Sequence, residues 1–383
     1  MKGTREDIKV YEPYMLRALQ LAEKARGMTS PNPMVGAVLI RDGKIVGEGY
    51  HERAGAPHAE VVALREAGQL ARGSTLIVTL EPCNHYGRTP PCTEAIIKAG
   101  ISKVVIGLQD PNPLNAPGGA VRLREAGVEV DIGLLAERVA KQNEVFLKHI
   151  TTGRPFVLVK VAMSLDGRIA RRVGEKTKLT CWEATEEVHR LRSEYDAILV
   201  GIGTVKVDDP LLTSRPSTEI FKNPVRVILD SRAELDLNSK IARTADNVRS
   251  IVAVSDEADS RRLDALKGAG LEILKVKSAG DGLLDLGNLL DELAKFGITS
   301  VMVEGGRRVV SSVVREGLAD KFIFFACPKL IGGLGLELID DSLADIVELD
   351  ITAMRRLGDD LEIEAYPQQI KWAIEGRGSQ GQG

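Results

Sequence analysis

Apolar and polar residues alternate along the first 150 positions with the periods of helices and strands. Apolar side chains at three- and four-residue spacing predict a helix over 12–27. Two apolar runs, 35–40 and 44–46, flank the pair Asp42-Gly43, which is typical of a type I′ hairpin turn. Further along, helix and strand patterns alternate, which indicates a mixed or parallel sheet covered by helices. The predicted helices are 59–66, 93–98, 120–125 and 134–150, and the predicted strands are 75–80, 103–107 and 128–132.

A second series of helices and strands begins after residues 151–155, TTGRP, whose Gly and Pro favour a domain boundary. We expect one domain over 1–150 and a second over 151–370. A disordered tail is expected over 371–383, whose end is rich in Gly, Gln and Ser. In the second domain the predicted strands are 156–161, 197–200, 225–229, 250–254, 271–274, 300–303, 321–326 and 361–365, and the predicted helices are 185–192, 260–266, 286–295 and 309–316.

Composition narrows the class of protein. The 383 residues are 44% hydrophobic and 27% charged, as in ordinary globular proteins. The formal net charge of −3 provides no basic surface for gripping long nucleic acid. No apolar run approaches the roughly 20 residues that cross a bilayer, and residues 1–10 lack the apolar core of a signal peptide. We therefore expect a cytoplasmic chain without membrane contact and without a disulfide framework, in which any clustered pair among the four cysteines serves metal binding or catalysis.

The densest chemistry lies between residues 51 and 92. His58-Ala59-Glu60 opens a predicted helix, Glu81-Pro82-Cys83 follows a predicted strand, and Cys92 precedes the next helix. One His and two Cys leave the fourth tetrahedral position of a zinc ion open, which is the ligand number of a catalytic site. Glu60 can face the metal without ligating it and carry a proton from the bound water to a departing amine. We expect His58, Cys83 and Cys92 to hold one zinc ion per chain and Glu60 to be catalytic.

Two simpler interpretations compete with a catalytic zinc site. A His-x-Glu triplet arises often by chance, and free cysteines are common small core residues. A structural zinc site would in turn require four protein ligands. The order of the three motifs, each at a strand end or a helix start, is far less accidental. The pattern matches the zinc deaminase signature, except that eight residues rather than two separate the cysteines.

The segment 81–92, EPCNHYGRTPPC, closely resembles the deaminase half of the bifunctional deaminase/reductase family of riboflavin biosynthesis. Segments 31–36, 49–60 and 109–113 resemble it as well, and the resemblance continues to about residue 366. It implies an α/β fold of two domains: a cytidine-deaminase-like three-layer α/β/α domain, then a dihydrofolate-reductase-like α/β domain. The residues that it implies for the deaminase substrate are Asn32, His51, His85, Arg88, Asp110 and Asn112, with Arg88 suited to a phosphate.

The second half lacks the Gly-x-Gly-x-x-Gly of an ordinary dinucleotide site after its first strand. Residues 301–308, VMVEGGRR, predict a strand, a Gly turn and a helix start, where backbone N–H groups and two arginines can hold a phosphate. Gly-Gly at such a turn is more often only backbone geometry. Segments 160–168, 203–210 and 229–231 resemble the reductase half of the same family. The NADPH contacts that this implies are Ala162, Lys178, Thr204, Asp208, Ser231, Gly306, Arg307, Arg308, Val309, Val310, Ser311 and Ser312.

The resemblance also implies a phosphosugar site in the second half. Arg192 and Arg215 have the planar fork that suits a phosphate, and the simpler alternative for each is a solvated surface arginine. The chain departs from the family at 176–180, KTKLT, where a Ser and, two residues on, a Trp are common. We expect Lys176 and Lys178 to change how substrate and nicotinamide are held. The implied substrate contacts are Lys160, Lys176, Arg192, Leu212, Arg215 and Glu304.

Taken with the resemblance, the sequence predicts a bifunctional enzyme, both hydrolase and oxidoreductase. The first domain would use zinc hydroxide to deaminate 2,5-diamino-6-ribosylamino-4(3H)-pyrimidinone 5′-phosphate. The second would use NADPH to reduce the ribosyl chain, giving 5-amino-6-ribitylamino-uracil 5′-phosphate. We expect small phosphorylated pyrimidines as partners, no nucleic acid, and a homo-oligomer, either dimer or tetramer.

Two other classes of protein remain as alternatives. A nucleic-acid-editing deaminase with an appended binding domain would need a basic, aromatic-bearing groove, which the charge of −3 and the 4% aromatic content oppose. A regulatory protein with a decayed site is opposed by the complete His, Glu, Cys and Cys set in the first half, and less firmly in the second half.

Overall fold

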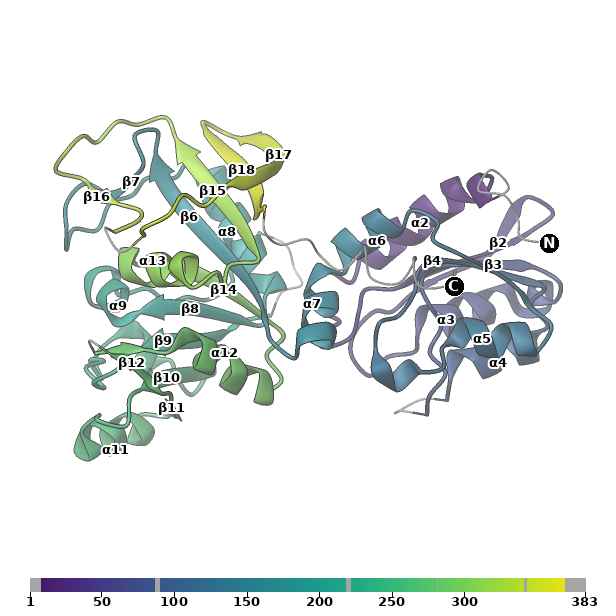
Figure 1. Ribbon diagram of the computed structural model, residues 1–383, viewed down its shortest axis with the longest axis horizontal. Coiled ribbons are helices and arrows are strands. Elements are labelled where there is room, and N and C mark those ends of the chain that lie inside the picture. Colours follow the sequence, from purple (N-terminus) through teal and green to yellow (C-terminus); the bar gives the residue numbers. More distant parts are fainter. Residues whose placement is uncertain (1–7, 87–89, 218–221, 281, 341–342, 369–383) are drawn as a thin grey trace. The chain divides into compact units, whose positions relative to one another are not determined.

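The computed structural model describes residues 8–86, 90–217, 222–280, 282–340 and 343–368 (Figure 1). The chain forms two compact units, Met1–Gly153 and Arg154–Gly383, and each contains its own α/β sheet. The expected disordered tail, 371–383, lies outside the described residues. Within the described part, no helix has both the length and the apolar character of a membrane span.

The first unit is built on a five-stranded mixed sheet with strand order β2-β1-β3-β4-β5. The first hairpin turns at Asp42 and Gly43, with φ of 51° and 73°, which confirms the predicted type I′ geometry. β3, β4 and β5 are parallel, whereas β1 pairs antiparallel with both of its neighbours. The strands are β1 (Gly36–Arg41), β2 (Lys44–Tyr50), β3 (Thr75–Leu80), β4 (Lys103–Leu108) and β5 (Glu129–Ile132).

Helices cover both faces of this sheet and confirm the three-layer α/β/α arrangement (Figure 1). Ala37 and Leu39 of β1 pack in the core with α3, α4 and α5, while the alternate residues Val38 and Ile40 pack with α2 on the other face. β1 is therefore apolar on both sides. The helices are α2 (Glu12–Glu23), α3 (Ala59–Ala67), α4 (Cys92–Ala99), α5 (Gly119–Glu125), α6 (Ala136–Gln142) and α7 (Glu144–Thr152), with short 3₁₀ turns η1 (Gly68–Ala71) and η2 (Pro113–Asn115).

Helix α3 lies against β2 at backbone contact distance. A Cβ atom on Gly47 would lie 2.4 Å from the carbonyl oxygen of Ala63, and one on Gly49 would lie 2.4 Å from that of Ala59. Any larger residue at these positions would displace the helix. The two glycines thus set the position of α3, whose first turn carries Glu60 and whose N-cap is His58.

The prediction of one helix over 134–150 is wrong, because the chain breaks into α6 and α7 at Asn143. The buried Asn143 side chain accepts a hydrogen bond from the Met34 N–H (2.8 Å) and donates one to the Met34 carbonyl (3.0 Å). Its backbone leaves the helical region, with φ −108° and ψ 21°. This long-range pairing outweighs the local helical pattern.

The second unit contains a nine-stranded sheet of order β11-β10-β9-β8-β14-β6-β15-β18-β17. The strands from β11 to β15 run parallel to their neighbours, and β18 and β17 extend the sheet antiparallel at one edge. The strands are β6 (Phe156–Ser164), β8 (Ala197–Gly201), β9 (Val225–Leu229), β10 (Ser250–Val254), β11 (Glu272–Lys275), β14 (Ser300–Gly305), β15 (Lys321–Cys327), β17 (Leu349–Leu357) and β18 (Asp360–Pro367); two small sheets pair β7 (Arg168–Ala170) with β16 (Leu336–Glu337) and β12 (Ser278–Gly280) with β13 (Leu283–Leu284).

One continuous core joins this sheet to its helices. Val157, Val159 and Val161 of β6 pack in the same cluster as Leu289 and Leu293 of α12, at the helical spacing that the sequence predicts. The fold agrees with the expected dihydrofolate-reductase-like α/β domain. The helices are α8 (Trp182–Glu194), α9 (Ile202–Asp208), α10 (Lys240–Arg243), α11 (Ser260–Gly268), α12 (Leu286–Lys295) and α13 (Arg307–Arg315).

Candidate functional site

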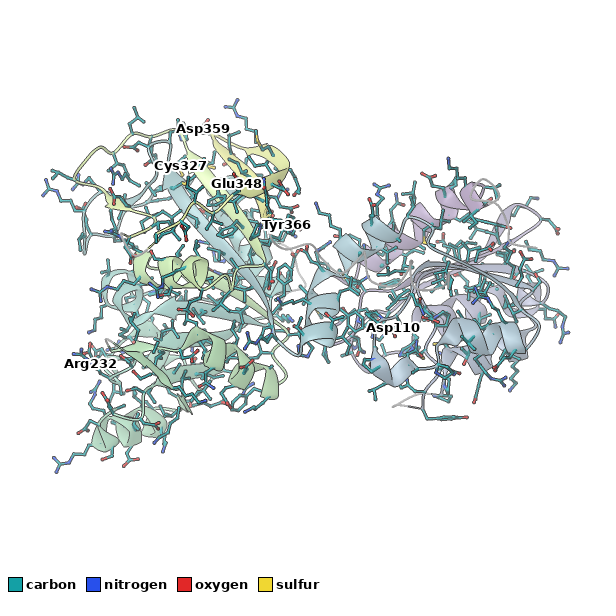
Figure 2. All side chains as sticks on the ribbon, viewed as in Figure 1. Asp110, Arg232, Cys327, Glu348, Asp359 and Tyr366 are labelled. Carbon is teal, nitrogen blue, oxygen red and sulfur yellow. The ribbon has the colours of Figure 1, made fainter. Side chains whose placement is uncertain are left out.

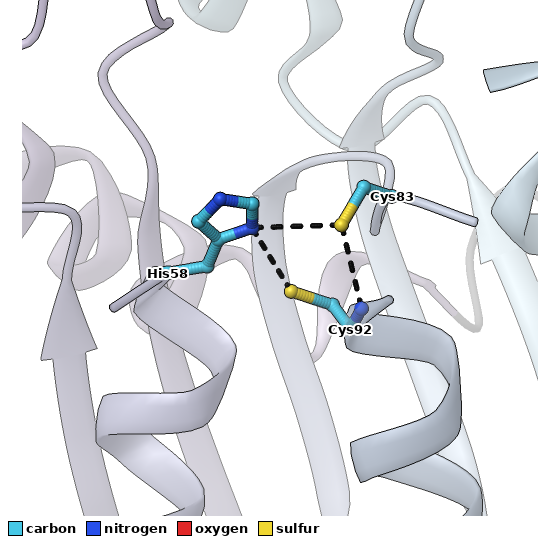
Figure 3. A group of neighbouring side chains, drawn as sticks. All are labelled: His58, Cys83 and Cys92. Carbon is cyan, nitrogen blue, oxygen red and sulfur yellow. Dashed lines mark hydrogen bonds between the residues drawn. The ribbon is translucent and has the colours of Figure 1, made fainter. Parts of the chain in front are cut away.

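The three predicted metal ligands of the first unit converge at the ends of a strand and two helices (Figure 3). His58 is the N-cap of α3, Cys83 follows β3, and Cys92 is the first residue of α4. The His58 Nδ1 atom lies 3.2 Å from Cys92 Sγ and 3.5 Å from Cys83 Sγ. Within the described part of the chain, this is the one cluster of at least three His, Cys, Asp or Glu side chains with metal-binding spacing.

The donor set fits zinc. Bonds of about 2.0–2.1 Å to nitrogen and 2.3 Å to sulfur, arranged as a tetrahedron, separate ligand atoms by ~3.5 Å. All three donor atoms here lie within 4.8 Å of one another, and the two nitrogen–sulfur distances are close to the tetrahedral value. Three protein ligands leave one position for water or substrate.

Hydrogen bonding prepares Cys83 as a thiolate. The Cys92 thiol, followed by the His58 ring, holds the pKa of Cys83 well below its usual range, against the opposing effect of burial. The Cys92 backbone N–H also points at the Cys83 sulfur, at 3.3 Å. The pKa of Cys92 is raised by the same pairing with Cys83 and by burial. The cluster therefore offers one ready thiolate and one thiol that must lose its proton when a metal binds.

Glu60 lies in the first turn of α3, two residues after His58, and only 3% of it is exposed. Burial raises the pKa of its carboxyl, and the negative charge of Cys83 raises it further. A buried carboxyl beside a thiolate holds a proton more readily than an exposed one does. The position and the environment both suit a group that takes up and releases a proton.

Asn32 and His51, two predicted substrate residues, lie together beside the metal cluster. The His51 ring lies edge-on to the His58 ring, with centroids 5.4 Å apart. Its Nδ1 lies 3.1 Å from the Pro57 carbonyl oxygen, which can only accept, so Nδ1 carries the proton. Nε2 must then accept from the Asn32 side-chain amide at 3.1 Å. This chain of hydrogen bonds fixes how the Asn32 amide is turned.

Asp110, labelled in Figure 2, and Asn112 lie in the loop that follows β4. His85 lies in the loop that follows β3. Burial, together with the nearby Glu81, raises the pKa of Asp110 to about 6, although its hydrogen bond from the Asn112 N–H opposes the shift. The Asn112 side chain caps η2 by accepting from the Leu114 N–H. His85 Nδ1 is buried and has no hydrogen-bond partner among the described residues. The remaining predicted contact, Arg88, lies outside the described residues.

The second unit contains a cavity of about 1160 Å³ at the carboxyl ends of β8, β14 and β9. Ligands of open α/β sheets bind at this edge. Four of the predicted contacts do not line the cavity: Lys176, Lys178, Arg215 and Ser311. The predicted residues that do line it are Lys160, Ala162, Arg192, Thr204, Asp208, Leu212, Ser231, Glu304, Gly306, Arg307, Arg308, Val309, Val310 and Ser312.

Three of these four residues make hydrogen bonds within the protein. Ser311 is fully buried, and its hydroxyl accepts a hydrogen bond from the Asp340 N–H. The Lys176 ammonium donates to the backbone carbonyl of Asp208, a residue that lines the cavity, at 3.1 Å. Lys178 is exposed, and its carbonyl accepts from Lys329. Nothing in the structure explains a role for Arg215.

A charged triad lies inside the cavity. Arg192 donates Nε–H and Nη2–H to the two carboxylate oxygens of Glu304, and the Lys160 ammonium lies 3.1 Å from the same carboxylate. Burial alone would raise the pKa of Glu304, but Arg192 and Lys160 lower it to about 2. Glu304 is therefore a carboxylate that holds two cations in place, a pairing that the sequence did not predict.

The Gly305-Gly306 turn joins β14 to α13 on the wall of the cavity. Gly305 and Gly306 have φ of 119° and 74°, and a Cβ atom on Gly306 would lie 2.9 Å from the Thr204 hydroxyl. Only glycine suits this backbone and this close approach. The first amides of α13 consequently border the cavity, next to Arg307 and Arg308.

Comparison with known proteins decides the family. The model described as the cytidine and deoxycytidylate deaminase zinc-binding region matches residues 8–108, and the model of the RibD C-terminal domain matches residues 155–363. The riboflavin biosynthesis protein RibD of Aquifex aeolicus is 44% identical over 91% of this chain and 96% of its own length. RibD of Escherichia coli strain K12 is 40% identical over 91% of this chain and 97% of its own.

The chain belongs to the RibD family of riboflavin biosynthesis proteins.

Solved RibD structures share the whole fold. An Acinetobacter baumannii RibD structure superposes with a TM-score of 0.86 at 38% identity, covering 94% of this chain and 100% of that one. A Thermotoga maritima protein superposes with a TM-score of 0.81 at 38% identity, covering 94% and 99%. The Thermotoga protein is described as a diaminohydroxyphosphoribosylaminopyrimidine deaminase/5-amino-6-(5-phosphoribosylamino)uracil reductase.

Both sites of this RibD-family chain lie inside the matched regions. The His58, Cys83 and Cys92 cluster falls in the zinc-binding region, and the cavity falls in the RibD C-terminal domain. The chain thus has the deaminase part and the reductase part of a riboflavin biosynthesis protein. The family implies a zinc ion in the first and a nicotinamide cofactor in the second.

Sequence reasoning missed several residues at these RibD sites. Glu81 and Asn115 are buried and hydrogen-bonded to the loops of the metal cluster, and Arg172, Thr177 and Arg232 line the cavity. The motif around residue 81 signalled a strand end, but nothing in it marked the carboxyl of Glu81 as functional.

Proposed function

We propose that this chain deaminates 2,5-diamino-6-ribosylamino-4(3H)-pyrimidinone 5′-phosphate in its first unit. Its second unit then reduces the ribosyl chain with NADPH, which gives 5-amino-6-ribitylamino-uracil 5′-phosphate. The observation that carries the proposal is the cluster of His58, Cys83 and Cys92 beside the buried Glu60. A RibD relative whose description names both reactions supports the choice of substrate.

In the deaminase, His58, Cys83 and Cys92 would hold the zinc ion. A zinc ion held by three protein ligands would lower the pKa of a bound water toward about 7, which activates that water for attack. Glu60 would accept a proton from the attacking water and deliver it to the departing amine, which its buried position two residues from His58 permits. The reaction replaces the exocyclic amine by oxygen and releases ammonia.

The substrate would be held by the loops around the cluster. Asn32, turned by His51, presents its carbonyl oxygen as a hydrogen-bond acceptor, because its amide nitrogen already donates to His51. Asp110, Asn112 and His85 would complete the pocket from the loops after β4 and β3. Arg88 would bind the substrate phosphate, since a guanidinium pairs well with phosphate oxygens.

In the reductase, the chain binds and orients two reactants. The bound nicotinamide cofactor supplies the hydride that reduces C1′ of the ribosyl group. The amides at the start of α13, with Thr204 and Ser231, would hold the cofactor phosphates and ribose. Lys160 and Arg192, held by Glu304, would face the phosphosugar from the cavity wall. We propose NADPH rather than NADH because Arg307 and Arg308 provide two cations at the same wall for the additional phosphate.

The same proposal includes the compartment, the partners and the oligomeric state of the enzyme. A reducing compartment such as the cytoplasm suits the two ligand cysteines, which bind metal only as reduced thiolates. The proposed partners are small phosphorylated pyrimidines, without nucleic acid, and the proposed assembly is a homodimer or homotetramer. Light scattering on the purified chain tests the assembly.

Mass analysis of the products tests both reactions. The purified chain is incubated with the diaminopyrimidinone phosphate, with and without NADPH. Without NADPH, the product should show only exchange of an amine for oxygen. With NADPH, it should gain two further hydrogens. An unchanged substrate mass in both samples would refute the proposal.

A further inference from the structure

Glu81 connects three segments of the first unit that surround the metal cluster. It directly follows β3, only 4% of it is exposed, and it lies two residues before Cys83. Its Oε2 accepts a hydrogen bond from the Asp110 N–H at 3.1 Å, and its Oε1 accepts one from the Ala120 N–H at 2.8 Å. One side chain therefore joins the metal-ligand segment, the loop after β4 and the start of α5.

The backbone is closely fitted around this carboxylate. A Cβ atom on Gly118, whose φ is +108°, would lie 2.9 Å from Glu81 Oε1. A Cβ atom on Gly119 would lie 1.9 Å from the Pro82 carbonyl oxygen. The chain at 118–119 thus leaves no room for a side chain against 81–82, and the Glu81 carboxylate lies in close contact with the backbone whose Ala120 amide it accepts.

A third hydrogen bond anchors the middle of the same loop. The buried Asn115 accepts the Asn84 N–H at 2.7 Å through its side-chain oxygen, and the Asn84 side chain accepts from Thr93 of α4 at 2.9 Å. Residues 110–120 are therefore attached to 81–84, the segment that carries Cys83, at Asp110, Asn115 and Ala120. Asp110 and Asn112, two of the proposed substrate contacts, lie within the attached stretch.

We propose that Glu81 is a positioning residue for deamination, which sets the distance between the substrate-holding loop and the metal-ligand segment. It acts through Asp110 and Asn112 and touches neither metal nor substrate. The inference rests on the proposed deaminase function. Its physical basis is that a loop already held in its binding position does not have to be ordered when the substrate arrives, so a loosened loop weakens substrate binding.

The test is the Glu81→Gln variant, measured with the diaminopyrimidinone phosphate. Glutamine keeps the size of the side chain but offers one acceptor oxygen instead of two, so one of the two backbone amides loses its partner. We expect KM for deamination to rise by ~10-fold or more, as the loss of a hydrogen bond to a charged group allows. The value of kcat should change much less, and bound zinc should stay near that of the unsubstituted chain.

Glu66→Gln is the matched control. Glu66 also accepts a backbone N–H, from Glu48, but is exposed and lies away from the metal cluster. This variant should keep the normal KM. Glu81→Asp adds a test of geometry, since aspartate keeps the charge but cannot reach both amides. It should raise KM as Glu81→Gln does.

Three results would overturn the proposal: a normal KM in Glu81→Gln, an equal rise in Glu66→Gln, or zinc loss that accounts for the effect. Hydrogen exchange on the unsubstituted chain gives a test that does not depend on a variant folding. The Asp110 and Ala120 amides should exchange slowly, and fast exchange would contradict the proposed attachment. If the unsubstituted chain binds zinc but does not deaminate, the proposed function fails instead, and this exchange result still stands.

Discussion

Arg192 and Glu304 form a two-bond ion pair inside the reductase cavity, with Nε–Oε1 at 2.5 Å and Nη2–Oε2 at 2.8 Å. Only 13% of the Arg192 side chain and 6% of the Glu304 side chain are exposed. Parallel hydrogen bonds of this kind fix both the position and the plane of a guanidinium. The cation that faces the cavity is therefore oriented before any substrate arrives.

The ion pair makes a prediction about acid stability. The pKa of Glu304 is lowered to about 2 from 4.5, so the carboxylate stabilises the folded state at pH values above about 4.5. This contribution, on the order of 3 kcal/mol, should be lost as pH falls from about 4.5 toward 2. Glu304→Gln should therefore destabilise the chain at pH 7, and the difference from the unsubstituted chain should shrink in acid. Calorimetry at pH 7 and pH 3 measures this, and an equal difference at both pH values would contradict it.

Removing the Glu60 carboxylate should separate the two chemistries. Glu60→Gln keeps the side-chain size, so the zinc content should change little, but the amide cannot accept or return the proton. Deamination should fall by ~10²–10⁴. Reduction of already deaminated substrate should continue at close to the normal rate, measured as NADPH consumption. Deamination at the normal rate in this variant would exclude Glu60 as the residue that transfers the proton.

The metal-ligand assignment predicts about one zinc ion per chain in protein purified without added zinc. Cys92→Ser replaces a thiolate by a hydroxyl, which is a much weaker zinc ligand. This variant should lose most of its zinc and its deamination together. Elemental analysis measures the metal, and removal with a chelator should reproduce the loss in the unsubstituted chain. Full zinc in Cys92→Ser would exclude Cys92 as a ligand.

The two arginines at the start of α13 predict a preference for NADPH over NADH. At equal concentrations, NADPH should support the faster reduction, because Arg307 or Arg308 can pair with the additional phosphate. Replacing both arginines by Ala should narrow the difference between the two cofactors. The affinity for each cofactor, measured by fluorescence without substrate, provides a readout separate from turnover. Equal rates with both cofactors in the unsubstituted chain would remove any selective role for these arginines.

Secondary structure was predictable where burial imposes a clear pattern. The strands β3, β9 and β10 and the helix α12 have the bounds expected from the sequence, since apolar runs or stripes mark them. The edge strand β17 was missed because it is exposed along most of its length and its apolar and polar residues alternate only over its first half. The break at Asn143 was missed because its partner, Met34, is 109 positions away.

The metal cluster was predictable because His and Cys at strand ends and helix starts carry a chemical signature. Glu81 was not, since the groups that it binds are backbone amides of Asp110 and Ala120, and any residue has such an amide. The resemblance implied Arg192 and Glu304 as separate substrate contacts. Their pairing, across 112 positions of sequence, required the fold.

The two glycines of β2 have a consequence for how this enzyme tolerates change. Gly47 and Gly49 lie opposite the carbonyls of Ala63 and Ala59. The distance between β2 and α3 is therefore set by contact between two main chains. No rotamer adjustment can widen or narrow such a gap, so repacking of neighbouring side chains leaves the first turn of α3 in place. A single methyl group added at Gly47 would instead displace α3 as a rigid body. His58 and Glu60 would then move together relative to both cysteines, and metal affinity and proton transfer would decline in parallel.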